Sequence, residues 1–283
     1  MEGLIYLGSW TRLLLLVVTN VNLQKTSAKT FRSAAAALIA VLTVGIASAA
    51  IALQLPGSMR LFGYAERASI GVAEFPKWTR VLQRYAREEA IETLPCREGA
   101  CVLQRWRAHL DSLKGRDWSE QLRSIDAYVN RTRFIPDAGN YGIADYWATP
   151  RELFARGGDC EDFAITKYLS LRRLGWNMDN VRIAVTMETR RRELHAVLAV
   201  KAGGTIWILD NLLSEPTDHR QVRQYRPIFS LNEHAWWFHS SPGAPTLVSA
   251  ADRELMQRAS CKTTSDFVFA LERYMLFAEV GPY

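Results

Sequence analysis

The sequence predicts an α+β fold in which N-terminal helices pack on an antiparallel sheet. Segments with the apolar periodicity of helices lie between residues 78 and 174, whereas short β-branched and apolar segments with a tight-turn signal follow residue 181. Helices first and strands later are typical of α+β folds rather than of alternating α/β folds. The chain has 283 residues, of which 48% are hydrophobic, so it can bury a sizeable core.

The helical part begins with three amphipathic segments. In the first, Trp78, Val81, Leu82 and Tyr85 share one face. A fourth helix starts near Cys160 and stops where glycine supplies a left-handed residue. Between the third and fourth helices the chain is rich in Gly, Pro, Asp and aromatics, which predicts an ordered loop. The expected helices are Trp78–Ile91, Val102–Leu113, Trp118–Thr132 and Cys160–Leu174, and the loop is Phe134–Pro150.

Three strands are expected after the fourth helix, over Val181–Met187, His195–Val200 and Thr205–Leu209. The last two flank the tight-turn signal Lys201–Gly204, so they form an antiparallel hairpin. A further helix is expected over Ala251–Ala278, and no linker marks a second globular domain. We therefore expect residues 51–283 to form one domain.

The first 50 residues have the features of a targeting segment. Lys25, Lys29 and Arg32 precede an uncharged, alanine-rich stretch over 33–55, and Ala47–Ala49 is a small-x-small site of the kind that signal peptidase cuts. The alternative is an uncleaved membrane anchor, because the uncharged stretch is long enough to span a bilayer. Both alternatives predict that the remaining domain is exported.

The charge pattern does not favour nucleic acid as a partner. The formal net charge is +6, but the basic residues are scattered, and Arg190–Arg192 is the one tight run. Nucleic-acid binders usually show a denser basic stripe with interleaved aromatics. The arginine run precedes His195, so it either borders a functional cleft or forms a solvated loop.

The four cysteines suggest two different roles, disulfide pairing and a free thiol. In an oxidising compartment, Cys96 and Cys101 are close enough in sequence to close a disulfide around a short polar loop, and their spacing suits zinc poorly. Cys261 is expected in or near a helix. Cys160 is then left as a candidate free thiol.

The segment GGDCEDFAI, Gly157–Ile165, surrounds this cysteine with acids. Asp159 and Asp162 have the spacing of a helix-capping pair, which is an ordinary structural role. Cys160, however, would occupy the first helical position, where the helix dipole and free N–H groups lower a thiol pKa. Because the neighbouring carboxylates oppose a thiolate, a nucleophilic role needs a group that offsets them.

A thiol nucleophile also needs a base and a residue that orients it. His195 opens one strand of the hairpin and Asp210 follows the next. A turn centred on Ala202–Gly203 makes them direct cross-strand neighbours, and a turn at Gly203–Gly204 places them diagonally on the same face. A three-residue loop would instead point them to opposite faces.

Cys160, His195 and Asp210, in this order, and the motifs GDCEDFA, HAVLAV and LDN resemble the bacterial transglutaminase-like cysteine proteinases, the LapG-type periplasmic proteases. The resemblance covers roughly residues 118–213. It implies a papain-like, transglutaminase-like fold, a periplasmic location, and Cys160 as nucleophile, His195 as base and Asp210 as orienting residue.

The resemblance also implies calcium, bound beside the nucleophile by Asp159, Glu161 and, more weakly, Asp162. It implies a protein substrate, a large surface adhesin whose cleavage disperses a biofilm, and an inner-membrane cyclic di-GMP receptor that sequesters the protease. Two alternatives stay open: an acyl transferase or amidase that uses the same triad, and an inactive binding module with the same fold.

Overall fold

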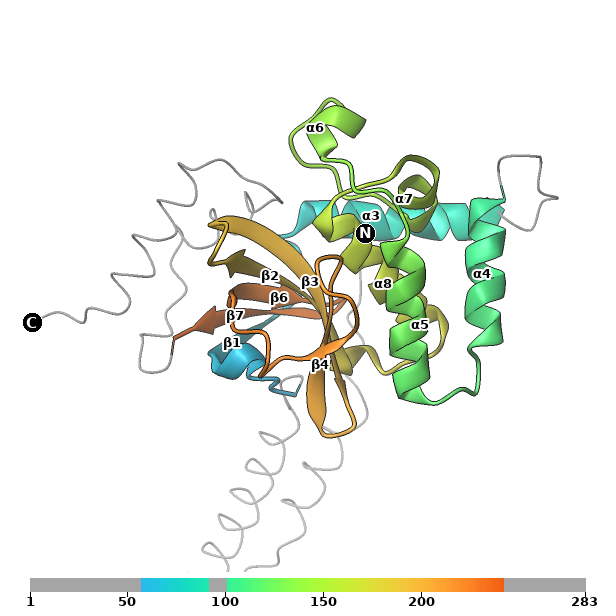
Figure 1. Ribbon diagram of the computed structural model, residues 1–283. Coiled ribbons are helices and arrows are strands. Elements are labelled where there is room, and N and C mark those ends of the chain that lie inside the picture. Colours follow the sequence, from blue (N-terminus) through green and yellow to red (C-terminus); the bar gives the residue numbers. More distant parts are fainter. Residues whose placement is uncertain (1–56, 92–100, 242–283) are drawn as a thin grey trace, which may run out of the picture. The chain divides into compact units, whose positions relative to one another are not determined.

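The computed structural model describes residues 57–91 and 101–241, which belong to one compact unit, Leu55–Tyr283 (Figure 1). The expected targeting segment and the expected helix Ala251–Ala278 lie outside the described residues. Among the described residues, no helix has both the length and the apolar character needed to cross a membrane.

The helices lie mainly on one side of the sheet, as Figure 1 shows. Three amphipathic helices and the fourth, buried helix agree with the predicted ranges to within a few residues at each end. Two further short helices lie in and just after the predicted loop. The helices are α3 (Pro76–Ile91), α4 (Val102–Ser112), α5 (Trp118–Asn130), α6 (Asp137–Asn140), α7 (Pro150–Arg156) and α8 (Cys160–Arg173), with 3₁₀ turns η1 (Leu61–Gly63) and η2 (Met178–Asn180).

The sheet has seven strands, and all of its pairings are antiparallel. Their spatial order is β1-β7-β6-β2-β3-β4-β5, so the three predicted strands lie side by side and the first of them continues the sheet through β6. The strands are β1 (Ala65–Ile70), β2 (Val181–Glu188), β3 (Glu193–Ala202), β4 (Thr205–Leu209), β5 (Thr217–Asp218), β6 (Tyr225–Leu231) and β7 (Ala235–Ser240).

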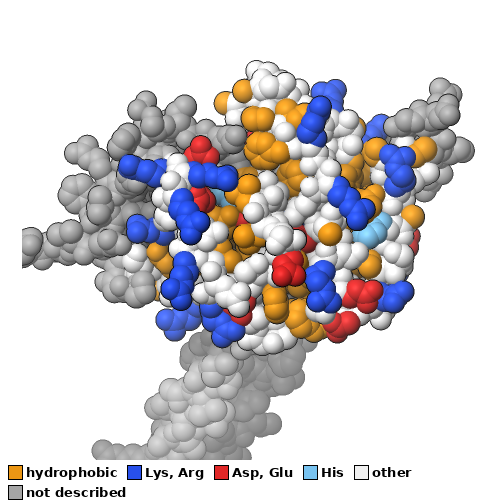
Figure 2. All heavy atoms as spheres, in the orientation of Figure 1, with side chains coloured by type: hydrophobic (Ala, Val, Ile, Leu, Met, Phe, Trp, Pro, Cys, Tyr) orange, Lys and Arg blue, Asp and Glu red, His pale blue; other side chains and the backbone are white. Residues whose placement is uncertain are grey.

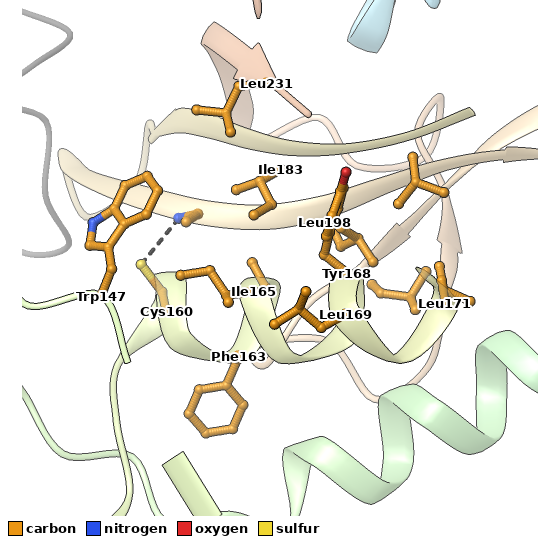
Figure 3. Close-up of a cluster of buried hydrophobic side chains, with 14 of the residues drawn as sticks. Trp147, Cys160, Phe163, Ile165, Tyr168, Leu169, Leu171, Ile183, Leu198 and Leu231 are labelled. Carbon is orange, nitrogen blue, oxygen red and sulfur yellow. Dashed lines mark hydrogen bonds between the residues drawn. The ribbon is translucent and has the colours of Figure 1, made fainter. Parts of the chain in front are cut away.

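Helix α8 is the centre of the core. Every residue of its first three turns is buried, including Ile165 and Leu169, which lie at the interface with the sheet (Figure 3). It packs against β3 and β2 on one side and against α5 and α7 on the other. A helix buried on all sides cannot shift easily, because interior packing is dense. The first turn of α8 is therefore held at a fixed position beside the start of β3.

Candidate active site

Cys160 is the first residue of α8, and its side chain is 2% exposed. Its Sγ accepts a hydrogen bond of 3.1 Å from the backbone N–H of Ala196 on β3, as Figure 3 shows. The 14-residue helix also directs the positive end of its dipole at the sulfur. Both effects favour a negative charge on Sγ, as the sequence analysis expected for this helical position.

The β3–β4 hairpin brings His195 and Asp210 together. Its turn is centred on Gly203–Gly204, which both have positive φ, and Ala202 pairs with Thr205. The two residues are therefore diagonal neighbours rather than direct partners, which was one of the predicted registers. His195 Nε2 lies 2.7 Å from Asp210 Oδ1, and both side chains are buried.

Asp210 is itself held in place by three further groups. Tyr225 on β6 donates a hydrogen bond of 2.5 Å to Oδ2, and the backbone N–H of Leu212 donates one of 3.0 Å to Oδ1. The side-chain amide of Asn130, at the end of α5, donates a hydrogen bond to the backbone carbonyl of Asp210. Burial alone would raise the pKa of Asp210, but the bonds and charge interaction with His195, followed by the Tyr225 bond, lower it. Asp210 thus remains a carboxylate.

Cys160 and His195 line one small pocket of about 40 Å³. Because Nε2 of His195 is engaged with Asp210, Nδ1 is the ring nitrogen that can exchange a proton with a group in this pocket. Arg191, from the arginine run, also lines the pocket, which agrees with one of the two alternatives for that loop. The other described lining residues are Phe134, Glu188, Glu193, Leu194, Asn211 and Leu212.

An acidic cluster adjoins the sulfur on its other side. Ligand-type oxygens of Asp137, Asp145 and Glu161 lie within 4.8 Å of one another, and so do those of Asp137, Asp159 and Asp162. The three acids that the sequence analysis singled out therefore share one region with two acids of the preceding loop. Glu161 also contacts the sulfur, with Oε2 3.4 Å from Cys160 Sγ.

Burial makes the charged form of this cluster costly. The pKa of Glu161 is raised well above its ordinary value by burial and then by the charges of Asp159 and Asp162. Burial and the Asp159 charge raise the pKa of Asp137 to about 7. Burial raises the pKa of Asp145, although its ion pair with Lys77 opposes that shift. Buried carboxylates without a cation are expected to hold protons in this way.

The donor set fits a hard divalent cation. Asp137 Oδ1, Asp145 Oδ1 and Glu161 Oε1 are buried and have no hydrogen-bond partner among the described residues. Buried polar atoms are rarely left unpaired unless an ion or water satisfies them. Several carboxylate oxygens and no nitrogen or sulfur form the ligand chemistry that Ca²⁺ prefers. Asp162 differs, because its oxygens already accept from the backbone N–H groups of Ala148 and Asp159.

The geometry also confirms the helix-capping role that the sequence predicts for Asp162. Its Oδ2 accepts the Asp159 N–H at 3.2 Å, and its Oδ1 accepts the Ala148 N–H at 2.6 Å. Gly158 is packed against this carboxylate so closely that an added Cβ would lie 2.3 Å from Oδ2. The second glycine of the GG pair therefore lets the capping carboxylate fit.

The oxidation state of the thiols differs from the expectation. Neither Cys101 nor Cys160 is a free thiol in the structure, so the prediction of a free Cys160 is wrong for this state of the molecule. Cys96, the expected partner of Cys101, lies outside the described residues, as does Cys261. Chemistry at Cys160 needs the reduced side chain, because only a thiolate is a nucleophile.

A buried ion pair joins the two helices α8 and α5, which both carry residues of the site. Lys167 on α8 and Asp126 on α5 are 2.6 Å apart, and both side chains are 1% exposed. Burial raises the pKa of Asp126, and the Lys167 charge opposes that shift. Burial likewise lowers the pKa of Lys167, opposed by Asp126 and then Asp210. This pair fixes α8 to α5, which also carries the Asn130 amide that bonds the Asp210 carbonyl.

No sequence pattern indicated a metal-binding role for Asp137 or Asp145, or a role for Tyr225. Asp137 and Asp145 lie in a segment without periodicity, so no pattern indicates where their side chains point. Tyr225 lies on an unpredicted strand. The Gly-, Asp- and aromatic-rich composition of 134–150 was the one available signal for the first two.

The chain is similar to one protein family and to several solved structures. A sequence profile described as bacterial transglutaminase-like cysteine proteinase, BTLCP, matches residues 96–237, which is half of the chain. No curated protein matches it. Among solved structures, Legionella pneumophila LapG is similar at 27% identity and a TM-score of 0.46, over 56% of this chain and 85% of that one.

Two further Legionella pneumophila LapG structures are similar. The calcium-bound form has 26% identity and a TM-score of 0.47 over 64% of this chain and 97% of its own. The EGTA-treated form has 22% identity and a TM-score of 0.46 over 73% and 100%. The profile match spans Cys160, His195, Asp210 and the acidic cluster. The chain belongs to the bacterial transglutaminase-like cysteine proteinases and is a cysteine peptidase.

Proposed function

We propose that this cysteine peptidase is an exported, calcium-dependent endopeptidase that uses Cys160, His195 and Asp210 as its triad. The observation that carries the proposal is that His195, which lines one pocket with Cys160, is hydrogen-bonded to Asp210 in a chain from this family. A nucleophile, a base and an orienting carboxylate in this order are what thiol acyl transfer needs.

In the first half of the reaction, the reduced Cys160 transfers its proton to His195 Nδ1 and Sγ attacks the carbonyl carbon of the scissile peptide bond. Asp210 holds the imidazole by Nε2 and stabilises the imidazolium. His195 then donates the proton to the leaving amine, the C–N bond breaks, and a thioester joins Cys160 to the acyl part of the substrate.

In the second half, water attacks the thioester carbonyl while His195 takes a proton from it. The C–S bond breaks, the product acid leaves, and the proton returns to the sulfur. Trp147 has a buried indole N–H that interacts with the Asp145 carboxylate but makes no well-aligned hydrogen bond to a described residue. It is a candidate donor to the developing oxyanion, as is the backbone N–H of Cys160.

Calcium would be held by Asp137, Asp145, Asp159 and Glu161, with Asp162 more firmly engaged in capping. When bound, the ion supplies positive charge that lets these carboxylates ionise and that lowers their repulsion of a thiolate. Glu161 is the link between the two functions, because one of its oxygens lies 3.4 Å from Cys160 Sγ. Calcium is therefore expected to control nucleophile strength.

The proposed substrate is a protein in the cell envelope, with a large surface adhesin as the first candidate and a periplasmic location for the enzyme. An inner-membrane cyclic di-GMP receptor is the corresponding candidate regulator. The targeting segment in the first 50 residues supports export, and the family resemblance supports the adhesin and the receptor.

The test is cleavage of a co-expressed adhesin fragment, with purified reactions run in reductant and calcium. We expect Cys160→Ala to abolish cleavage, Cys261→Ala to retain it, and a chelator to reduce cleavage by the unmutated enzyme. Added amine should not appear in the products, which separates hydrolysis from acyl transfer. Unchanged cleavage by Cys160→Ala would remove the assignment.

A further inference from the structure

A second, larger cavity lies next to the catalytic pocket. Its volume is about 500 Å³, and it lies between α4, α5, α7 and residues 131–133, which follow α5. In Figure 2, Lys and Arg side chains are spread over the side of the molecule formed by these helices, with hydrophobic side chains between them. Its principal lining residues are Arg105, Arg131, Arg133, Arg156, Tyr128 and Phe154.

The cavity is electrostatically one-sided. Its four arginines come from α4, α7 and the segment after α5, and none of its described lining residues is Asp or Glu. Among the described residues, none of the four forms an ion pair with a carboxylate. All four arginines are exposed, and the Arg156 guanidinium also lies over the Tyr141 ring. The cavity therefore offers an excess of positive charge to a ligand that arrives from solution.

The cavity and the catalytic pocket share a wall. Phe134 lines the catalytic pocket and Arg133 lines the cavity, and Phe134 forms a β-bridge with Gly158. The Ile135 N–H donates to the Gly158 carbonyl at 2.8 Å, and the Gly158 N–H donates to the Arg133 carbonyl. Gly158 lies two residues before Cys160. The wall between the two sites is therefore built from the segment that leads directly into the nucleophile.

We propose that this arginine cavity binds a run of Asp or Glu side chains that flanks the scissile bond of the protein substrate. The guanidinium fork matches a carboxylate with two parallel hydrogen bonds, and Tyr128 and Phe154 provide apolar surface for the side-chain stems. An acidic segment of a polypeptide fits better than a small phosphate compound, because the cavity adjoins the pocket that the same polypeptide must enter. The substrate role rests on the proposed peptidase function.

Binding can be measured without catalysis. The probes are a fluorescent peptide with several glutamates, a twin with glutamine at those positions, and ATP as a phosphate compound. Each is titrated into full-length Cys160→Ala protein by fluorescence anisotropy or calorimetry. The cavity variant adds Arg131→Ala and Arg133→Ala, which leave the backbone contacts of Arg133 in place. The control adds Arg80→Ala and Arg223→Ala, two exposed arginines outside the cavity.

We expect the glutamate peptide to bind the Cys160→Ala and control proteins alike, and the cavity variant about tenfold more weakly. The glutamine twin should bind weakly to all three, and added salt should weaken the glutamate peptide. A variant with Arg131→Glu and Arg133→Glu should bind a peptide with lysine at the glutamate positions more tightly than it binds the glutamate peptide. This reversal would show that charge, and not misfolding, decides which peptide binds.

Equal binding of the glutamate and glutamine peptides, or equal binding by the cavity and control variants, would overturn the proposal. Binding of ATP without binding of the glutamate peptide would make the cavity a phosphate site and overturn it as well. A Cys160→Ala protein that binds the acidic peptide while the reduced wild-type enzyme cleaves nothing would instead count against the peptidase function alone.

Discussion

Glu161 Oε2 lies 3.4 Å from the Sγ of Cys160, the adjacent residue in the chain. The same side chain belongs to the cluster with Asp137 and Asp145, and its second oxygen is buried without a hydrogen-bond partner among the described residues. A carboxylate so close to a thiolate opposes it unless a cation or proton neutralises the carboxylate. A thiolate at Cys160 therefore requires a cation or a proton at Glu161.

Removal of one cluster carboxylate should weaken calcium binding. Asp137→Asn and Glu161→Gln keep the side-chain shape but lose a charged ligand, so we expect Ca²⁺ affinity to fall by roughly tenfold or more in each. The measurement is calorimetric titration of chelator-treated protein. Asp179→Asn, at an exposed acid outside the cluster, is the matched control and should bind as wild type. Wild-type calcium affinity in both Asp137→Asn and Glu161→Gln would exclude the cluster as the calcium site.

Asp210→Asn should leave the fold intact but reduce peptide hydrolysis by roughly 10²–10⁴-fold, because the imidazole loses its orienting acceptor. Tyr225→Phe should have a smaller effect, since it removes one of several bonds to Asp210. The comparison of kcat for the two variants on one substrate checks the order. A larger loss in Tyr225→Phe than in Asp210→Asn would contradict the assigned role.

The Asp126–Lys167 pair should be costly to break on one side only. Lys167→Met leaves a buried carboxylate without its partner, and we expect about 3–5 kcal/mol lower free energy of unfolding. Adding Asp126→Leu should restore much of this loss, because the lone buried charge is gone. Urea unfolding of the single and double variants measures both values. A double variant as unstable as the sum of the singles would show that the pair is not coupled.

His239 should make stability depend on pH. Burial, and secondarily the Arg182 charge, lower its pKa to about 3 from about 6.5 in an unfolded chain. The folded state therefore needs the neutral ring, so its contribution is present above pH 6.5 and is lost as pH falls toward 3. Between pH 6.5 and 5 the slope should approach about 1.4 kcal/mol per pH unit.

Urea unfolding at several pH values checks this slope. His239→Gln should flatten it, whereas His234→Gln, at an exposed histidine near the start of β7, should not. If the two variants kept the same slope as wild type, burial of His239 would not be the source of the pH dependence.

The sequence predicted the elements that carry their own periodicity. Helix α8 and the hairpin of β3 and β4 could be derived because apolar pattern and turn chemistry agree locally, whereas the register at Gly203–Gly204 was one of several that the sequence left open. Strands β1, β6 and β7 were not predicted. β1 pairs with β7 and β6 pairs with β2, which are distant in sequence, and long-range pairing leaves no local signal. β6 and β7 also pair with each other across a short turn, and this local hairpin was missed.

The same contrast between local and long-range signals applies to the residues of the site. Cys160, His195 and Asp210 could be proposed because each lies at the end of a predicted element. Asp137 joins the cluster only because the loop after α5 folds back over the start of α8. The arginine cavity was equally hidden, since Arg105 and Arg156 are scattered in sequence and meet only in the folded chain.

The most direct test measures how alkylation of Cys160 by iodoacetamide varies with pH, in reductant, with the labelled residue identified by mass spectrometry. The account predicts an apparent thiol pKa well below the ordinary value of about 8.5, which rises in His195→Gln and when a chelator removes calcium. A thiol that titrates at its ordinary value or higher, and that ignores both His195→Gln and the chelator, would contradict the account.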